Sequence, residues 1–485
     1  MLENIIEDRR KKMDMLKAEH ADPYPARVRR SFSLGTFLDS FASLQRTQKN
    51  ICLAGRVKSI RDQGKIMFVH LEDASGKTQI VVRKDAVHTF SLFKKTADAG
   101  DFVEACGKAY TTQRGEKSLD AKHIRVITKS LRALPTDFYG IADVETRLRK
   151  RYIDTITNPD VRTLFMQKSA FWRAVKTFLE QEGFLSVETP VLEATPGGAE
   201  AEPFVTHHNT LDEDFYLRIS LEIALKKMII GGFEKVYELG RVFRNEGIDA
   251  EHLQDYTQLE FYWAYADYTQ LMKLVQRLYR YAIKETFKTL TFASEKTSIA
   301  WGKPWATIVY GDIFKKKNKG LDILSCGDVD LLKRAKELKI QTPKGAGRGR
   351  LIDLIYKKTV RPTLIQPCFL INPPVEIEPL AKRSDKDPRV VERFQVIAYG
   401  TELGKGFSEL NDPIDQRARF EDQMRLRAKG DAEAQRLDED FLEAMEYGMP
   451  PTAGFGFSER LFAVLAGKPI RETVFLPPMK RKEKK

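Results

Sequence analysis

One segment near the middle of the chain restricts its fold more than any other. Residues 237–262 read YELGRVFRNEGIDAEHLQDYTQLEFY, which predicts two extended strands joined by a polar hairpin loop of about ten residues. Period-two spacing places Arg244 on the face of Glu238 in the first strand, and Glu260 on the face of Tyr262 in the second. A planar guanidinium beside carboxylates suits a ligand that carries both a phosphate and an amine. A hairpin whose exposed charges only pair with one another would have the same pattern.

Two further segments flank this hairpin in an order that points to a family. Residues 171–190, FWRAVKTFLEQEGFLSVETP, predict an amphipathic helix followed by a short strand, and residues 450–465, PPTAGFGFSERLFAVL, predict a glycine-rich strand followed by a helix. With FRNEG of the hairpin between them, these segments resemble the three motifs of the class II aminoacyl-tRNA synthetases. The resemblance places motif 1 at about 171–190, motif 2 at about 236–263 and motif 3 at about 450–465.

Other segments are similar to one branch of that family, the bacterial-type lysyl-tRNA synthetases. They are LRISLEIALKK at 217–227, GFEKVYELGRVFRNEG at 232–247 and GFSELNDP at 406–413. The resemblance covers nearly the whole chain, from residue 21 to residue 479. It implies an ATP-dependent aminoacyl-tRNA ligase that converts L-lysine to lysyl-adenylate and transfers lysine to tRNA(Lys), with Mg²⁺ as cofactor. It also implies a homodimer, with motif 1 at the dimer interface.

The resemblance implies a lysine pocket rich in carboxylates. Glu222 would meet the α-amino group, while Glu260 and Glu409 would meet the ε-ammonium. A buried ammonium needs carboxylates and hydrogen-bond acceptors, because its desolvation otherwise costs several kcal/mol. Taken singly, each glutamate is more typical of a solvated or structural charge, whereas the three together in their motifs favour the lysine pocket. The implied lysine-binding set is Gly198, Glu222, Glu260, Tyr262, Phe407 and Glu409.

The same resemblance implies the residues that bind ATP. Arg244 would hold the α-phosphate and the reacting carboxylate, and Arg460 would lie over the adenine ring opposite Tyr256; the two arginines form the implied catalytic set. The complete ATP-binding set is Arg244, Glu246, His252, Tyr256, Glu402 and Arg460. The implied ligands of Mg²⁺ are Glu402, Glu409 and Gln395.

The chain departs from the family pattern at several of these positions. Gln395 stands where the resemblance leads us to expect a second metal-binding glutamate, and Lys405 stands where it leads us to expect an asparagine. Glu251 replaces an arginine just before the histidine of motif 2, and Glu459 replaces the common aspartate in a motif 3 that is one residue shorter. We therefore expect phosphate binding to be altered, with Lys405 replacing the charge that Glu251 removes.

The N-terminal part of the chain has a different pattern. Residues 51–126 contain five short β-patterned runs separated by turns, which fits a five-stranded OB-fold barrel that binds single-stranded nucleic acid. By resemblance, the anticodon contacts are Phe68, Arg56, Arg61 and Gln79. An aromatic side chain on a barrel strand can also belong to the core. The family glutamate expected close to Lys122 and His123 is absent there.

The expected fold class is α+β, with two domains. A class II synthetase catalytic domain, with an antiparallel sheet and flanking helices, is predicted over residues 141–485. An N-terminal helix and the OB-fold anticodon-binding barrel are predicted over residues 1–140. A chain of 485 residues exceeds one ordinary core, which agrees with two domains.

Composition is consistent with this interpretation. A net charge of +13 favours an anionic partner such as nucleic acid, although a solvated basic surface would look the same. No apolar run is long enough to span a membrane and the N-terminus is charged, so we expect a cytoplasmic protein. Cys52, Cys106, Cys326 and Cys368 are widely separated, without CxxC spacing, and we expect reduced thiols with neither a zinc site nor a disulfide.

Two other functions share parts of this pattern. A lysyltransferase that modifies a protein acceptor has the same catalytic domain but lacks the N-terminal barrel. A catalytically idle RNA-binding relative is favoured only by Gln395 and Glu251. Retention of Arg244, Glu402 and Arg460 argues for an active enzyme.

Overall fold

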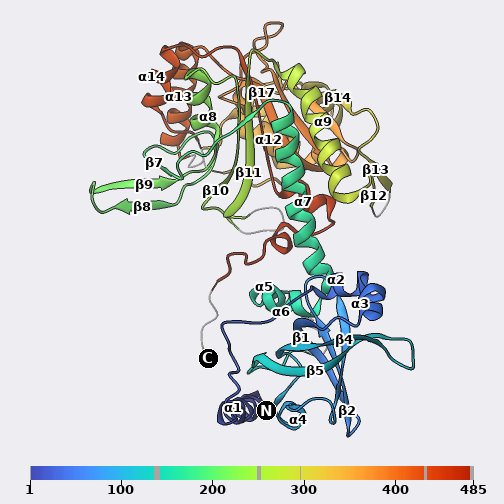
Figure 1. Cartoon of the computed structure of the whole chain (residues 1–485). Coiled ribbons are helices and arrows are strands. Elements are labelled where there is room, and N and C mark those ends of the chain that lie inside the picture. Colours follow the sequence, from blue (N-terminus) through green and yellow to red (C-terminus); the bar gives the residue numbers. More distant parts are fainter. Residues whose placement is uncertain are drawn as a thin grey trace. The chain divides into compact units, whose positions relative to one another are not determined.

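The chain forms two compact units, which we call the barrel unit and the sheet unit. The computed structural model describes residues 2–135, 143–247, 253–294, 297–343, 345–430 and 434–480. The barrel unit comprises Met1–Ala142 and Ile156–Asn158, and the sheet unit comprises Asp143–Thr155 and Pro159–Lys485 (Figure 1). Within the described residues, no helix is long and apolar enough to cross a membrane.

The barrel unit contains a closed five-stranded barrel in the order β1-β2-β3-β5-β4. Inward positions alternate with outward positions along its strands; in β2, Met67, Val69 and Leu71 are buried. The predicted OB-type barrel is therefore confirmed. Its strands are β1 (Ile51–Asp62), β2 (Ile66–Glu72), β3 (Lys77–Arg83), β4 (Phe102–Thr111) and β5 (Lys117–Thr128), and its helices are α1 (Leu2–Ala18), α2 (Leu34–Asp39), α3 (Phe41–Thr47) and α4 (Phe90–Thr96).

A disulfide in this barrel corrects the expectation of four reduced cysteines. Cys52 of β1 and Cys106 of β4 are bonded to each other, whereas Cys326 and Cys368 are free. The two bonded residues are 54 positions apart in the chain but lie directly opposite each other in the antiparallel β1–β4 pair. Spacing along the chain does not reveal which residues a strand register brings together, and for this reason the expectation was wrong for this pair.

The sheet unit is built on an eight-stranded sheet in the order β14-β15-β16-β17-β18-β11-β10-β6. The pairs from β15 to β10 are antiparallel, as predicted, and the outermost pair at each edge is parallel. The strands are β6 (Leu185–Ser186), β10 (Lys235–Phe243), β11 (Asp255–Ala264), β14 (Ala306–Val309), β15 (Cys368–Ile371), β16 (Arg393–Ala398), β17 (Thr401–Ser408) and β18 (Thr452–Ser458). Two small sheets accompany it: β7 (Leu192–Glu193), β8 (Val205–His208) and β9 (Glu213–Leu217), and β12 (Thr291–Ser294) with β13 (Thr297–Ala300).

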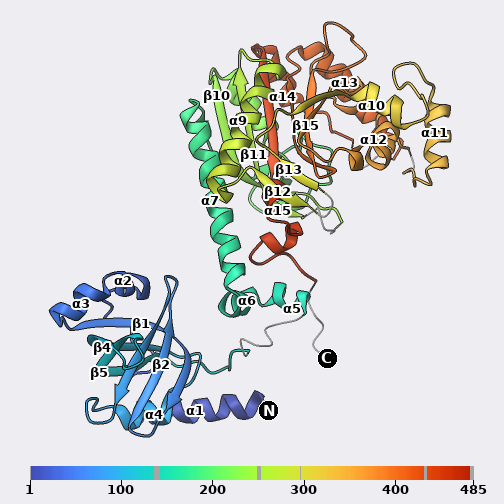
Figure 2. The same ribbon diagram turned by 90° about the vertical axis from the view of Figure 1, so that its right-hand side faces the viewer.

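The predicted motif 1 helix is part of α7 (Pro159–Gln181), which begins well before residue 171. Its predicted apolar side is buried against α9 (Tyr268–Phe287) and the central strands; Figure 2 shows these helices from the side. Strand alternation separates this core from the opposite face. Phe261 and Phe455 enter the core, whereas Glu260 and Gly456, their chain neighbours, lie on the face that carries the site described below.

The remaining helices form two smaller clusters. The first joins α8 (Glu222–Ile230), α13 (Pro413–Ala428) and α14 (Glu439–Glu446) through Ile223, Phe420 and Phe441, which pack with Phe407 of β17. The second is made by α10 (Tyr310–Lys317), α11 (Asp328–Glu337) and α12 (Arg348–Thr359). Short helices α5 (Val144–Arg149) and α6 (Arg151–Thr157) precede α7, and α15 (Arg460–Leu465) follows β18.

Candidate active site

A cavity of about 920 Å³ opens on the sheet face opposite α7 and α9. It brings together most residues of the predicted lysine and ATP sets, which come from segments far apart in the sequence. Glu409 does not line it directly, and His252 lies outside the described residues. The predicted residues that line the cavity are Gly198, Glu222, Arg244, Glu246, Tyr256, Glu260, Tyr262, Gln395, Glu402, Phe407 and Arg460.

Arg244 directs a guanidinium into this cavity from the end of β10. Its Nε donates to the carbonyl oxygen of Ile219 at 3.2 Å, and its guanidinium carbon lies 5.7 Å from the centre of the Tyr256 ring. Among the described residues, no carboxylate forms an ion pair with Arg244. Its charge is therefore held by one backbone contact and is open to an anionic ligand.

Arg460 enters the same cavity at the start of α15. Burial raises the pKa of Tyr256, and the positive charges of Arg244 and Arg460 oppose that shift. The neighbouring Glu459 is buried, forms an ion pair with Lys168 of α7 and accepts from the backbone NH of Thr257 at 3.3 Å. The longer acidic side chain of motif 3 thus connects that motif to the motif 1 helix.

Glu260 is held by four donors. Its Oε1 accepts from the Ser220 hydroxyl at 2.7 Å, the Leu221 backbone NH at 3.0 Å and the Gln258 amide at 2.6 Å, and its Oε2 accepts from the Tyr262 hydroxyl at 2.9 Å. This network fixes the carboxylate at the cavity wall in a single orientation.

Lys226, which the sequence analysis did not single out, lies between two of the predicted lysine-binding glutamates. Its Nζ is 2.7 Å from Oε1 of Glu222 and 2.5 Å from Oε2 of Glu409, and its side chain is fully buried. The ammonium also lies 5.5 Å from the ring centre of Phe407. One resident cation is thus shared by two carboxylates.

The other oxygen of Glu409 has no such partner. Oε1 is buried, and no hydrogen-bond donor reaches it within the described part of the chain. A Cβ built at Gly454 would lie 2.3 Å from this oxygen and 2.3 Å from the Tyr262 ring, and both Gly454 and Tyr262 line the cavity. Glu409 therefore presents a vacant acceptor immediately behind the cavity wall, and glycine at 454 keeps the approach open.

Burial controls the protonation of these acids. It raises the pKa of Glu222 to about 7, although the charge of Lys226 opposes the shift, and it raises the pKa of Glu409 well above its usual value. For Lys226, burial acts to lower the pKa, but the two carboxylates outweigh it and the pKa lies above its ordinary value. The two acids with one ammonium would carry one uncompensated negative charge, which burial disfavours.

Gly198 shapes the opposite side of this acidic end. Its φ is +80°, and a Cβ there would lie 2.8 Å from the Cβ of Glu222 and 3.1 Å from that of Ser220. A larger residue would be strained in its backbone and would displace the acidic side chain.

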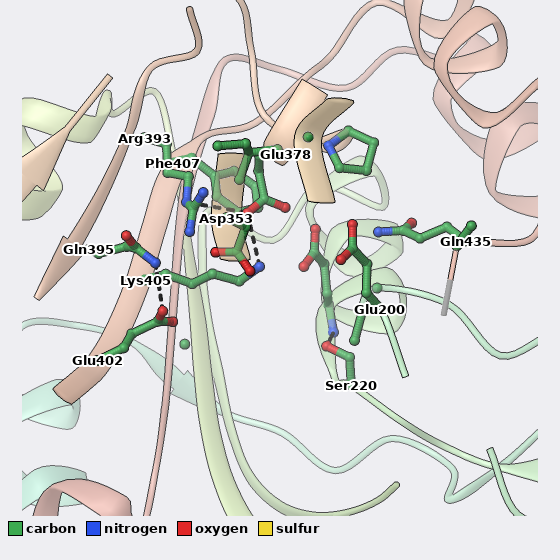
Figure 3. A pocket seen from close by; sticks show the side chains of 18 of the residues that line it. Glu200, Ser220, Asp353, Glu378, Arg393, Gln395, Glu402, Lys405, Phe407 and Gln435 are labelled. Atoms are coloured by element: carbon green, nitrogen blue, oxygen red, sulfur yellow. Dashed lines mark hydrogen bonds and ion pairs between the residues drawn. The ribbon is translucent and has the colours of Figure 1, made fainter. Parts of the chain in front are cut away.

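The three residues of the predicted magnesium set have different surroundings. Glu402 lies in β17, whereas Glu409 follows the last residue of that strand. Glu409 is paired with Lys226, and the Gln395 amide NH donates to Oε2 of Glu402 at 2.6 Å (Figure 3). Of the two carboxylates in the predicted set, Glu402 lines the cavity and Glu409 does not, so the geometry favours Glu402 as a ligand of Mg²⁺.

The predicted anticodon residues lie in the barrel unit, but only two of them share an outward surface. The guanidinium carbon of Arg61 lies 4.8 Å from the ring centre of Phe68, which points outward on β2. Arg56 instead lies 4.2 Å from the ring centre of Phe102 and donates to the Gly100 carbonyl oxygen at 3.1 Å. Arg56 is thus used in local packing.

Gln79 contacts a carboxylate, Glu116, that is not in the predicted anticodon set. Its amide NH donates to Glu116 at 2.8 Å, and His70, which is paired with Gln79 in the strand register, lies 3.5 Å from the same carboxylate. The resemblance implies a glutamate close to Lys122 and His123, whereas Glu116 lies at the turn that precedes β5. A second acid, Glu104, forms a group with Cys106 and His123, but its partners are Arg29 and Arg125 and the cysteine is in the disulfide.

Models of two known families match this chain. The model of the class II tRNA synthetases (D, K and N) matches residues 143–480, and that of the OB-fold nucleic acid binding domain matches residues 51–127. The chain is a class II tRNA synthetase. This finding confirms the family and the α+β fold that were expected from the three motifs.

Several full-length relatives of this synthetase are named as lysine–tRNA ligases. The chain is 42% identical to the lysine–tRNA ligase of Moorella thermoacetica, with 99% of this chain and 98% of the relative covered. It is 40% identical to the lysine–tRNA ligases of Shouchella clausii and Bacillus subtilis, again with 99% of this chain and 98% of each relative covered. The similarity thus includes both the barrel unit and the sheet unit.

Proposed function

We propose that this synthetase is a lysine–tRNA ligase that uses ATP to join L-lysine to tRNA(Lys). The observation that carries the proposal is the vacant Oε1 of Glu409, buried beside Gly454 and Tyr262. With Glu222 and Glu260 nearby, this end of the cavity offers negative charge and acceptors to a ligand ammonium. A pocket for aspartate would require the opposite charge. The names of the full-length relatives support the same substrate.

The first step joins lysine to the α-phosphate of ATP. A lysine carboxylate oxygen attacks the α-phosphorus, the bond to the pyrophosphate oxygen breaks, and lysyl-adenylate and pyrophosphate result. A carboxylate is already a nucleophile, so the protein needs no general base and contributes positioning and charge. Arg244 is proposed to hold the α-phosphate and the carboxylate, and Arg460 and Tyr256 to enclose the adenine, with Glu246 at its edge.

The second step transfers lysine to the tRNA. A terminal ribose hydroxyl attacks the carbonyl carbon of the adenylate, the bond to phosphate breaks, and AMP leaves. The cavity suits a polyanion because many of the residues that line it are basic. These residues include Arg348, Arg350, Lys357, Arg361, Arg383, Arg425 and Lys429.

Mg²⁺ is proposed to enter with ATP, since this ion retains several waters and usually takes one or two protein carboxylates together with substrate phosphates. Glu402 fits that role from the cavity wall. When bound, the ion would neutralise phosphate charge. The residue set supports one protein carboxylate ligand.

The barrel unit and motif 1 support two further parts of the proposal. Phe68 and Arg61 offer an aromatic platform and a basic group for anticodon bases, and the buried Gln79 holds the exposed carboxylate of Glu116. Exposed apolar side chains that follow α7, including Leu185 and Leu192, suit a subunit interface in a homodimer. We propose that the enzyme charges tRNA in the cytoplasm.

Pyrophosphate exchange with each of the twenty amino acids tests the activity directly. We expect exchange with lysine and none of comparable rate with aspartate or asparagine, and exchange driven by either of those would overturn the specificity. Transfer to tRNA, measured beside transfer to a protein acceptor, separates the ligase from a protein lysyltransferase. A folded protein without any exchange would instead be the idle relative.

A further inference from the structure

The cavity wall beside Glu402 contains fixed positive charge in an unusual place. Lys405 of β17 lies directly opposite Gln395 of β16 in the strand register, and both side chains line the cavity. Figure 3 shows the Lys405 side chain running between the Gln395–Glu402 pair and the carboxylate of Glu378. Both residues are departures from the family pattern, and the structure shows that they are neighbours.

The carboxylates at this wall are already neutralised by the protein. Lys405 Nζ lies 2.9 Å from Oε2 of Glu378, and Arg393 Nε lies 3.3 Å from the same oxygen. Glu402 accepts the Gln395 amide NH at 2.6 Å. Two carboxylates are thus met by two cations and one amide, so the group carries no net charge before any ligand binds.

A divalent cation needs the opposite arrangement, because Mg²⁺ selects anionic oxygen ligands at about 2 Å. An ammonium beside such ligands repels the ion, and an amide NH that points at Glu402 competes for its oxygen. With glutamate at 395 and asparagine at 405, the same wall would have one more negative charge and one fewer positive charge. The two departures together change its charge by that of one divalent cation.

We propose that Lys405, with Gln395, takes the place of one divalent cation at the phosphate end of the ATP site. The Lys405 ammonium then contacts an ATP phosphate directly. Each active site therefore binds one metal ion fewer than it would with glutamate at 395 and asparagine at 405. This inference rests on the proposed function, because it assumes that ATP occupies the cavity. It concerns Lys405 and Gln395 alone and leaves Glu402 as a ligand of an ion carried on ATP.

Counting bound ions tests the proposal without reference to catalysis. Mn²⁺ bound per active site would be measured by electron paramagnetic resonance with saturating lysine and a non-hydrolysable ATP analogue. We expect the double variant Gln395→Glu/Lys405→Asn to bind one more Mn²⁺ than the unmodified protein, and Lys405→Arg, which keeps the charge, to bind the same number. Equal numbers in the double variant and the unmodified protein would overturn the proposal.

Affinity without metal gives a second measurement. In EDTA, Lys405→Asn should weaken binding of the ATP analogue by about tenfold, the effect of losing one fixed charge contact.

Lys357→Asn is the matched control for the ion count. It removes a lysine from the same cavity, but one on α12 that pairs with Asp353 at 2.7 Å. We expect Lys357→Asn to leave the ion count unchanged. If Lys357→Asn gained as much Mn²⁺ as the double variant, the loss of any positive charge in the cavity would be enough to bind a further ion, and the proposal would be overturned.

The outcomes separate this inference from the proposed function. Lysine-dependent exchange by the unmodified protein, together with equal ion counts, would remove only the role of Lys405. Absence of exchange with lysine would remove the proposed function whatever the ion counts. If the double variant does not melt cooperatively, the single variant Lys405→Asn decides through its affinity in EDTA, where an unchanged value contradicts the proposal.

Discussion

The Nζ of Lys226 lies 2.7 Å from Oε1 of Glu222, inside the acidic end of a cavity that we propose binds lysine. The protein therefore already holds a buried lysine ammonium beside the proposed place of its substrate ammonium. Because Lys226 also contacts Glu409 at 2.5 Å, it allows two acids to remain close together in a buried place. It occupies one oxygen of each acid and leaves Oε1 of Glu409 vacant.

Replacing Lys226 by methionine should destabilise the protein, and the effect should depend on pH. Removing one partner from a buried ion pair typically costs about 3–5 kcal/mol. The two acids can lower this cost by binding protons, so the loss in melting temperature should be larger at pH 8 than at pH 6. Lys227→Met is the matched control, since Lys227 pairs with Asp440 at the surface. A pH-independent loss equal to that of the control would contradict the buried role of Lys226.

Lysine binding should release a proton near neutral pH. Burial raises the pKa of Glu222 to about 7, so a large fraction of this acid is protonated in the free protein at that pH. An incoming ammonium favours the ionised carboxylate and should expel the proton. Calorimetric titration of lysine in buffers with different ionisation enthalpies measures the release. Glu222→Gln should abolish it, and an unmodified protein that releases none at pH 7 would contradict the assignment.

The same shift has a consequence for stability. The folded-state pKa of Glu222 lies above the usual 4.5, so the folded protein binds more protons than the unfolded chain between these values. The contribution of this group to the free energy of unfolding is therefore fully present below about pH 4.5 and is lost as pH rises through about 7. In Glu222→Gln, the decrease in stability between pH 5 and pH 8 should be smaller than in the unmodified protein, as measured by urea unfolding.

Glu260→Gln should weaken lysine binding while the protein remains folded. The change removes one negative charge from the acidic end of the cavity. It also places an amide NH₂ beside the Ser220 hydroxyl and the Gln258 amide, which donate to the Glu260 carboxylate in the unmodified protein. We expect a rise in the KM for lysine that corresponds to about 2–5 kcal/mol. Glu238, directly opposite on β10, offers the control: it pairs with Arg218 at 2.7 Å and does not line the cavity. Glu238→Gln should lower the melting temperature and change the KM for lysine less than Glu260→Gln does. A larger change in KM for Glu238→Gln than for Glu260→Gln would exclude Glu260 from the lysine pocket.

The sequence predicted the elements of the site better than the contacts between them. The i, i+4 spacing of Glu222 and Lys226 in a helix was a signal for an ion pair that motif comparison overlooks. By contrast, the Cys52–Cys106 bond depends on a strand register that the sequence analysis did not predict.

Arg244 provides the most direct test of the proposed chemistry. If it neutralises charge that builds on the α-phosphate as pyrophosphate leaves, Arg244→Ala should reduce lysine-dependent exchange by roughly a hundredfold or more. Arg244→Lys should restore little of this rate, because an ammonium lacks the planar fork that can hold phosphate and carboxylate together. The alternative is that Arg244 serves only to brace the hairpin through the Ile219 carbonyl oxygen. That role predicts a lower melting temperature with exchange nearly intact. The exchange rate and the melting temperature of the same alanine variant distinguish the two, and a near-normal rate in a folded protein would exclude the catalytic assignment.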